Sequence, residues 1–349
     1  MSEMLGIELH ADSPLGSFIH EHVEPRAEDF NTFDRVKTHG GLLREAGRGR
    51  KLRSRAVGNN YAFLAQHATV GGMGEIVTSL VSDLALHISS SRTLTRQALI
   101  EASLPAPRAS AFPRSARQDA QQFLKSSTHP MVLQRDFSRL LNAPLHPLKE
   151  SSFTRSWETT TQRDDDVLFL AETPPGLVLR AFVVREEAVS ALVCVPFYVI
   201  GDGEKTLQEL IDDKVRLRRR HAFLAERVPF RNAAPTATDT VSQLREVLPP
   251  GVIRALGRSV NPFHEGIPVD VTDLISPHLK ELAVDAAWAV PGLTAGAVDI
   301  ITPQLESSDE TLVMGLDATA RLELHHYPAL GKPRPVAEMM MSAMVRRDH

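Results

Sequence analysis

The chain has 349 residues, of which 42% are hydrophobic and 23% are charged, and its formal net charge is −4. This length is too great for one compact core, so we expect two or three domains in a globular protein. The negative net charge gives no support for nucleic acid as a partner. The single cysteine, Cys194, excludes an intrachain disulfide and fits a reducing, cytoplasmic location.

The first part of the chain, residues 1–90, gives the weakest signals. Its start lacks a basic region followed by an apolar run, and no apolar stretch approaches the ~20 residues that cross a bilayer, so we expect neither a signal peptide nor a membrane partner. The basic run Arg48–Arg55 is more typical of a solvated surface than of a polyanion site. The glycine cluster Gly71–Gly74 matches no phosphate-binding loop, so a plain turn is the better interpretation.

From Ser91 onward the pattern is clearer. It predicts a short helix from Ser91, a strand over 129–137, a polar helix over 150–162, a strand over 166–172 and a strand pair over 175–184 and 188–200.

An apolar stretch ending in a glycine turn comes next. Val195–Ile200 is typical of a buried strand, and Gly201–Gly203 predicts a tight turn. Thr206 and Glu209 have capping-box spacing, which predicts a helix that begins near Thr206.

The C-terminal part alternates helices and strands. Ser276 and Pro277 predict the start of a helix, strands are expected over 295–302 and 311–318, and residues 335–347 are expected to be helical. Strand pairs interleaved with helices favour an α+β fold over strict β-α-β alternation.

Several of these stretches, in this order, resemble the ATP-grasp ligases, above all the ATP-grasp modules of cyanophycin synthetase and bifunctional glutathione synthetase. The matching stretches are "SRTLTRQALIEASLPAP", "VLFLAETPPGLVLRAFVV", "VPFYVIGDGEKTLQELID", "VNPFHEGIPVDVTDLISPHLKELA", "AGAVDII" and "VMGLDATARLELHHYPALGKPRPVAEMM". Together they cover roughly residues 91–344.

The resemblance implies a two-lobed fold that grips ATP in a cleft. The expected divisions are an N-terminal domain of unclear role (1–90), an N-terminal lobe (91–175) and a C-terminal lobe (176–349). The implied reaction activates a carboxylate as an acyl phosphate, which an amine then attacks. The implied partners are therefore small acids and amines of amino-acid type, as in a biosynthetic ligase, and the sequence leaves homo-oligomerisation open.

The resemblance also implies roles for particular residues. Arg180 and Asn261 occupy catalytic positions, and Asp299 and Asp317 occupy positions that bind Mg²⁺. The positions expected to contact ATP are Arg92, Gln134, Arg135 and Glu172.

The sequence departs from the family pattern at the phosphates and the metal. Gln134 stands where a phosphate-binding Lys is usual, and the stretch after it contains no glycine loop. Gly315 stands at the position of a metal-bridging Glu, and Asp317 at that of a metal-binding Asn. Arg135, Arg139 or Arg321 could replace the missing positive charge.

Two functions follow from these observations. The first is an ATP-dependent carboxylate–amine ligase with an altered site. The alternative is a catalytically degenerate ATP-grasp protein that binds a nucleotide or metabolite, or serves as a partner subunit.

Overall fold

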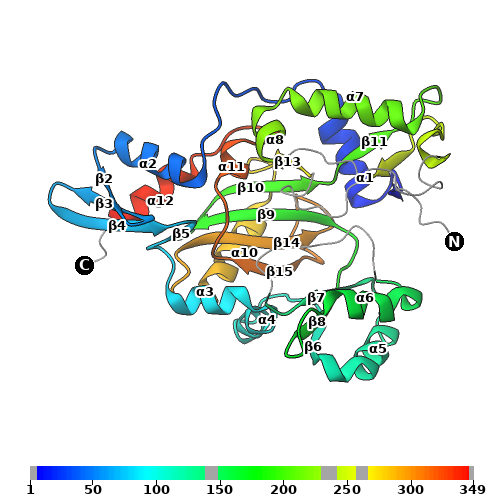
Figure 1. Ribbon diagram of the computed structural model, residues 1–349, viewed down its shortest axis with the longest axis horizontal. Coiled ribbons are helices and arrows are strands. Elements are labelled where there is room, and N and C mark those ends of the chain that lie inside the picture. The colour runs from blue at the N-terminus through cyan, green and yellow to red at the C-terminus, as the bar shows by residue number, and fades with distance from the viewer. Residues whose placement is uncertain (1–5, 138–147, 229–241, 257–265, 346–349) are drawn as a thin grey trace.

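A five-stranded antiparallel sheet forms the centre of the computed structural model, which describes residues 6–137, 148–228, 242–256 and 266–345 (Figure 1). Its strands lie in the order β13-β10-β9-β14-β15. Their bounds are Leu177–Val184 (β9), Glu187–Val195 (β10), Ile267–Asp270 (β13), Ala295–Thr302 (β14) and Leu312–Asp317 (β15). Every residue of β9 and β14 is buried, so both faces of the sheet are covered.

The predicted strand pair and the helix that follows it are confirmed. β9 and β10 pair antiparallel, and α7 (Leu207–Arg219) begins after Thr206 with both bonds of the capping box. Gly203 has a positive φ of 78°, which explains a glycine in the turn. The run over 195–200 is not one strand, because β10 ends at Val195 and β11 (Tyr198–Ile200) joins another sheet.

That other sheet is small and closes one end of the molecule. It contains β1 (Ile7–Leu9), β12 (Ile253–Ala255) and β11, in that order. The helices α1 (Pro14–Phe18) and α7 lie beside it, and α8 (Ala222–Arg227) lies at the far end of α7 (Figure 1).

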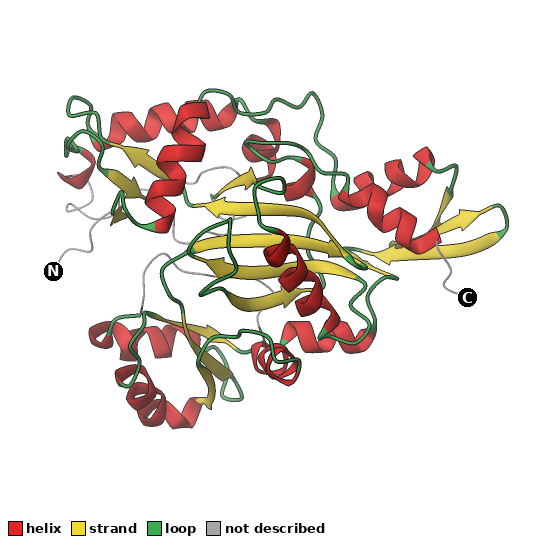
Figure 2. Ribbon diagram, turned by 180° about the vertical axis from the view of Figure 1, so that it is seen from behind, coloured by secondary structure: helices red, strands yellow, loops and turns green. Residues whose placement is uncertain are grey.

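A separate three-stranded sheet lies below the central one (Figures 1 and 2). It has the order β6-β8-β7, and its helices pack on one face. The elements are β6 (Ala109–Pro113), α5 (Arg117–Lys125), β7 (Met131–Arg135), α6 (Phe153–Thr160) and β8 (Val167–Glu172). Two helices, α3 (Asp83–Ser90) and α4 (Arg92–Glu101), precede it. The strands and helices predicted between residues 91 and 172 are therefore confirmed.

A four-stranded antiparallel arm projects from the opposite end of the central sheet (Figure 1). It contains β2 (Arg53–Val57), β3 (Asn60–Ala65), β4 (Ala68–Gly74) and β5 (Val77–Thr78). The helices α2 (His39–Gly49) and α12 (Val336–Val345) pack beside it. The prediction of a turn at Gly71–Gly74 is wrong, because these residues lie within β4. A Cβ on Gly72 would lie 2.9 Å from the carbonyl oxygen of Tyr61, so close strand packing explains that glycine.

One hydrophobic core joins the beginning and end of the chain. Phe18 and Phe63 belong to the same buried cluster as Leu179 and Met341. The helix α10 (Pro277–Trp288) covers the central sheet and has the predicted cap at Ser276, and α11 (Glu323–His326) precedes α12. The expected α+β class is confirmed, while the division at residues 90 and 175 stays a proposal. Among the described residues, no helix is long and apolar enough to span a membrane.

Candidate active site

Arg180, Asp299 and Asp317 form a buried charge cluster on the central sheet. Arg180 on β9 lies directly opposite Asp299 on β14, so the two side chains share one face. The Nη1 of Arg180 donates to Asp299 Oδ1 at 2.9 Å and to Oδ2 at 3.0 Å, and its Nη2 donates to Asp317 Oδ2. The exposed fractions of the three residues are 6%, 3% and 7%, so this ion cluster is largely shielded from water.

Electrostatic effects in the cluster oppose one another. Burial alone would lower the pKa of Arg180, but the Asp299 and Asp317 carboxylates outweigh it and raise that pKa. Burial raises the pKa of Asp299, Arg180 acts in the opposite sense, and Asp317 adds like-charge repulsion. The neighbouring Cys194 is buried, which raises the pKa of its thiol to about 12. Cys194 is therefore a protonated, buried small residue.

The arrangement does not fit a magnesium ion. Both oxygens of Asp299 accept hydrogen bonds from Arg180, and Asp317 Oδ1 accepts from the N–H of Thr319 at 2.9 Å and from its hydroxyl at 2.8 Å. Within the described ranges, no three His, Cys, Asp or Glu side chains come together to hold a metal. Asp299 and Asp317 do share one cation, as expected of the predicted metal ligands, but that cation is the guanidinium of Arg180.

A second guanidinium faces the same carboxylates. A Cβ built on Gly315 would lie 3.4 Å from Nη1 of Arg92, so the guanidinium of Arg92 lies next to Gly315 on β15. Burial lowers the pKa of Arg92, while Asp299, Asp136 and Asp317 oppose that effect. Arg92 and Arg180 together balance the charges of Asp299 and Asp317 without a metal.

Asp136 fixes the start of α4 and was not identified from the sequence. Its Oδ1 accepts from the N–H of Thr93 at 2.8 Å and from the Thr93 hydroxyl at 2.7 Å. Its Oδ2 accepts from the Ser91 hydroxyl at 2.7 Å. These contacts tie the helix that carries Arg92 to the end of β7. Ser91 and Thr93 are recognisable as capping residues, but nothing in the sequence names their distant partner.

A small cavity lies between the three-stranded sheet and β15. Its volume is about 20 Å³, which is room for about one water molecule. Ligand pockets are usually in the range of about 300–1,000 Å³. The lining residues are Arg92, Pro107, Val132, Gln134, Phe169, Ala171, Thr173 and Met314. Of the predicted ATP contacts, Arg92 and Gln134 therefore meet here.

Arg135 and Glu172 do not line this cavity. Gln134 and Arg135 are successive residues of β7 and point to opposite faces, and Nη1 of Arg135 donates to Gln162 Oε1 at 3.1 Å. The Glu172 carboxylate accepts from Arg108 Nη1 at 3.0 Å and from the Ser127 hydroxyl at 2.7 Å. Burial would raise the pKa of Glu172, but these two hydrogen bonds outweigh it and lower that pKa.

The segment between the two sheets offers few backbone donors. Thr173 donates its N–H to the carbonyl of Pro130 at 2.7 Å, and Pro174 and Pro175 have no N–H. A purine ring here would therefore find few backbone hydrogen-bond donors next to Glu172.

Three other sequence candidates lie away from this cluster or outside the described residues. Asn261 and Arg139 belong to segments that the structure does not describe. Arg321 lies near His39, whose pKa is lowered to about 4 by burial and by the charge of Arg321. The residues that line the small cavity do not include Arg321.

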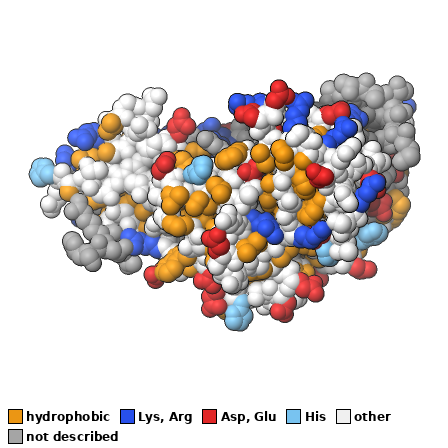
Figure 3. Space-filling view, turned by 90° about the horizontal axis from the view of Figure 1, so that it is seen from below, with side chains coloured by type: hydrophobic (Ala, Val, Ile, Leu, Met, Phe, Trp, Pro, Cys, Tyr) orange, Lys and Arg blue, Asp and Glu red, His pale blue; other side chains and the backbone are white. Residues whose placement is uncertain are grey.

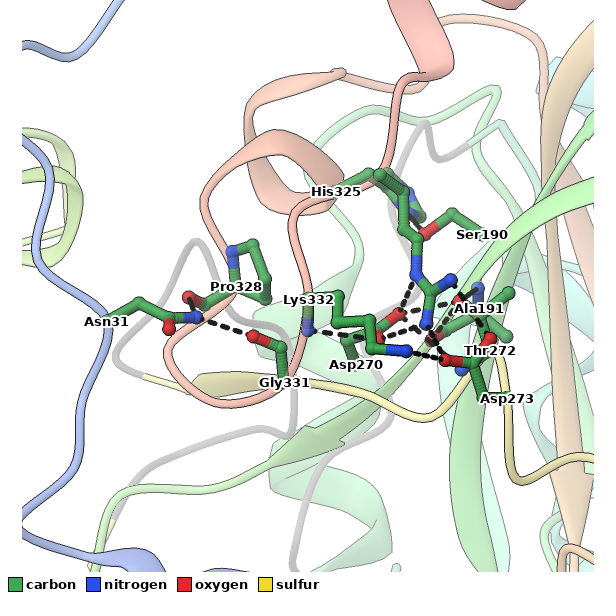
Figure 4. Close-up of polar contacts among 11 residues, drawn as sticks. Asn31, Ser190, Ala191, Asp270, Thr272, Asp273, His325, Pro328, Gly331 and Lys332 are labelled. Atoms are coloured by element: carbon green, nitrogen blue, oxygen red, sulfur yellow. Dashed lines mark hydrogen bonds and ion pairs between the residues drawn. The ribbon is translucent and has the colours of Figure 1, made fainter.

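A further cluster joins two of the stretches quoted for the resemblance (Figure 4). Asp270 accepts from Arg334 Nε at 2.9 Å and from Arg334 Nη2 at 2.6 Å. Asp273 accepts from Arg334 Nη1 at 3.0 Å and from Lys332 Nζ at 2.8 Å, and these bonds lower its pKa. These contacts connect residues 270–273 to residues 331–334.

The chain is similar in sequence to two kinds of curated protein, although no known family model matches it. It is 26% identical over 189 residues to the glutathione biosynthesis bifunctional protein GshAB of Clostridium perfringens, covering 52% of this chain and 24% of that protein. It is 22% identical over 276 residues to the cyanophycin synthetase of Geminocystis herdmanii, covering 76% of this chain and 31% of that protein.

One solved structure has the same fold over most of the chain. The bifunctional glutathione synthetase of Pasteurella multocida aligns with a TM-score of 0.61 and 17% identity, covering 89% of this chain and 44% of that one. The chain therefore spans less than half the length of each of these three proteins. It thus shares the fold of a bifunctional glutathione synthetase and is similar in sequence to glutathione-synthesising and cyanophycin-synthesising proteins.

Proposed function

We propose that this chain is an ATP-grasp protein of the carboxylate–amine ligase class, and that it turns over slowly. The proposed reaction activates a small, amino-acid-like acid as an acyl phosphate and joins it to an amine. Sequence similarity to glutathione-synthesising and cyanophycin-synthesising proteins supports the class. A cytoplasmic location belongs to the same proposal.

One observation carries the prediction of slow turnover. Arg180 occupies the carboxylates that a metal would need, so the positive charge near the phosphates must come from side chains. Arg92 is the described cation that lines the cavity between the sheets. Removal of a single preorganised charge contact typically costs ~3–4 kcal/mol of transition-state stabilisation, or about a hundred- to a thousand-fold in rate.

The size of the cavity adds a requirement for nucleotide binding. A volume of about 20 Å³ holds no nucleotide, so the three-stranded sheet must move away from β15 for ATP to enter. We therefore propose that ATP binding opens this cleft and brings the phosphates to Arg92 and Gln134.

The same charge cluster favours a second candidate function. In a degenerate ATP-grasp protein, the Arg180 cluster would serve stability alone, and the module would bind a nucleotide or metabolite or support a partner subunit. The cluster is fully hydrogen-bonded at both carboxylates, which is what a structural role requires.

Calorimetry with ATP, beside an ADP-release assay over a panel of amino acids, separates the two functions. We expect ATP to bind with little dependence on Mg²⁺ and ADP release to be slow but to require an acid and an amine together. Arg92→Met should weaken ATP binding, whereas Arg135→Met is the matched control and should not, because Arg135 lies on the face of β7 opposite Gln134. Binding without any ADP release would favour the degenerate protein. A lack of nucleotide binding with and without Mg²⁺ would exclude the ligase and a nucleotide-binding role for a degenerate protein.

A further inference from the structure

One face of the three-stranded sheet turns toward β15 and carries a strip of mostly apolar side chains. Val132 is paired with Ala171 across β7 and β8. Gln134 is paired with Phe169 two residues further along the same strands. Directly paired residues share a face, and all four line the small cavity together with Met314 of β15. This strip offers a flat ring an apolar surface to lie on.

The alternation of side chains along β8 decides which polar group ends the strip. Phe169, Ala171 and Thr173 line the cavity, as alternate residues of an extended chain do. Glu172 points to the other side of the chain, where its carboxylate contacts Arg108. Thr173 therefore supplies the polar side chain at this end of the cavity.

The Thr173 hydroxyl is buried and makes no hydrogen bond with any described residue. A buried polar group without a partner costs free energy, so an unpartnered hydroxyl that lines a cavity is a candidate ligand contact. The backbone beside it has no donor to add. Thr173 donates its N–H to the Pro130 carbonyl at 2.7 Å, and Pro174 and Pro175 have no N–H. The hydroxyl is therefore the remaining donor of residues 173–175.

The positive charge lies at the opposite end of the strip. The N–H of Arg92 donates to the carbonyl of Asp136 at 3.1 Å, which places Arg92 beside the end of β7 that carries Gln134. Thr173 follows Phe169 by four residues, or about 13 Å of extended chain. This length separates a base at Thr173 from phosphates at Arg92.

The outer surface offers the phosphates no clear alternative on the face seen from below. Among the described residues there, Lys and Arg side chains are scattered between acidic and hydrophobic ones rather than forming a broad basic area (Figure 3). The buried guanidinium of Arg92 is therefore the better place for the phosphates on this side of the molecule.

We infer, on the basis of the proposed nucleotide site, that Thr173 contacts the base and that the site accepts ATP and GTP alike. Adenine presents an acceptor at N1 beside a donor at N6, whereas guanine presents a donor at N1 beside an acceptor at O6. A fixed backbone N–H selects the adenine pattern, because guanine would leave that donor unpaired. Within residues 172–175, each N–H is already bonded or is missing at a proline. A hydroxyl rotates, so it donates to one base and accepts from the other.

Calorimetric titration of the full chain with ATP and with GTP, each with Mg²⁺, measures this lack of discrimination. The two dissociation constants should agree within about tenfold, whereas a site that selects by hydrogen bonds discriminates about 10⁴-fold or more. Thr173→Val removes the hydroxyl at nearly constant volume and should weaken both nucleotides about two- to tenfold, the effect of one hydrogen bond. Thr173→Ser keeps the hydroxyl and should retain the affinity for both.

The matched control removes a hydroxyl from the other face of the same sheet. Thr159 is exposed on α6, which packs against that face, and Thr159→Val should bind both nucleotides like the unmodified chain. Thr173→Val should also keep its midpoint of urea unfolding, because the hydroxyl that it removes contributes no hydrogen bond to the described fold.

A preference of more than about tenfold for either nucleotide would overturn the inference and leave the proposed function intact. The same holds if Thr173→Val binds like the unmodified chain, loses affinity for one nucleotide alone, or unfolds at a lower urea concentration. An equal loss of affinity in Thr159→Val would also overturn it. If neither nucleotide binds, the proposed function fails, and the role of Thr173 fails with it.

Discussion

Replacement of Arg180 by Met tests the description of the cleft most directly. The substitution removes the donors at 2.9 and 3.0 Å from Asp299 and the contact to Asp317, and leaves two carboxylates that are 3% and 7% exposed. Removal of one partner from a buried ion pair costs about 3–5 kcal/mol. Domains usually have only about 5–15 kcal/mol of stability, so the variant should lose a large part of its stability at neutral pH.

The loss of unfolding free energy in the Arg180→Met variant should depend on pH. Burial already raises the pKa of Asp299 while Arg180 opposes it, so loss of Arg180 must raise that pKa further. A folded-state pKa above the unfolded value stabilises the fold at pH values below the unfolded pKa, and this contribution is lost as pH rises through the folded pKa. The variant should therefore be closer to the unmodified chain near pH 4.5 than at pH 7, when urea unfolding is followed by circular dichroism.

Two comparisons make the experiment decisive. The triple variant Arg180→Met/Asp299→Asn/Asp317→Asn removes the buried charge altogether and should recover part of the loss. Mg²⁺ should raise the unfolding midpoint of Arg180→Met, because Asp299 and Asp317 no longer contact a guanidinium at position 180 in that variant. It should not raise the midpoint of the unmodified chain. A loss below about 1 kcal/mol for Arg180→Met at pH 7, or an equal loss at both pH values, would refute a charge cluster held by this arginine.

Three further expectations concern stability, each measured by urea unfolding. Thr206→Ala should cost about 1 kcal/mol, because it removes the α7 cap; an unchanged midpoint would contradict the observed capping box. Asp270→Asn should cost about 3 kcal/mol, since Asp270 is buried against Arg334, whereas the exposed Asp273→Asn should cost below about 1; equal losses would contradict this. Burial lowers the pKa of His39 to about 4, so stability should fall as pH drops from 6.5 towards 4, and His39→Gln should flatten that fall.

Local signals predicted the elements that are stabilised by short-range chemistry. The cap at Thr206 and the Ser276–Pro277 helix start act within one turn, and both are found where the sequence places them. The arm was missed because its strands are short, exposed or rich in glycine, so neither alternation nor hydrophobicity identifies them. Gly71–Gly74 predicts a turn on composition alone, while close packing between strands keeps it extended.

The candidate site shows the limit of residue-by-residue transfer from a family. The sequence places Arg180, Asp299 and Asp317 on strands, and the register of β9, β14 and β15 brings their side chains to one face of the sheet. What the residues do there depends on what they contact. An acidic pair can bind a metal ion or a guanidinium, and here it contacts the guanidinium of Arg180, with Arg92 beside Gly315. This is why the fold could be inferred from the order of motifs, while the chemistry of the cleft required the structure.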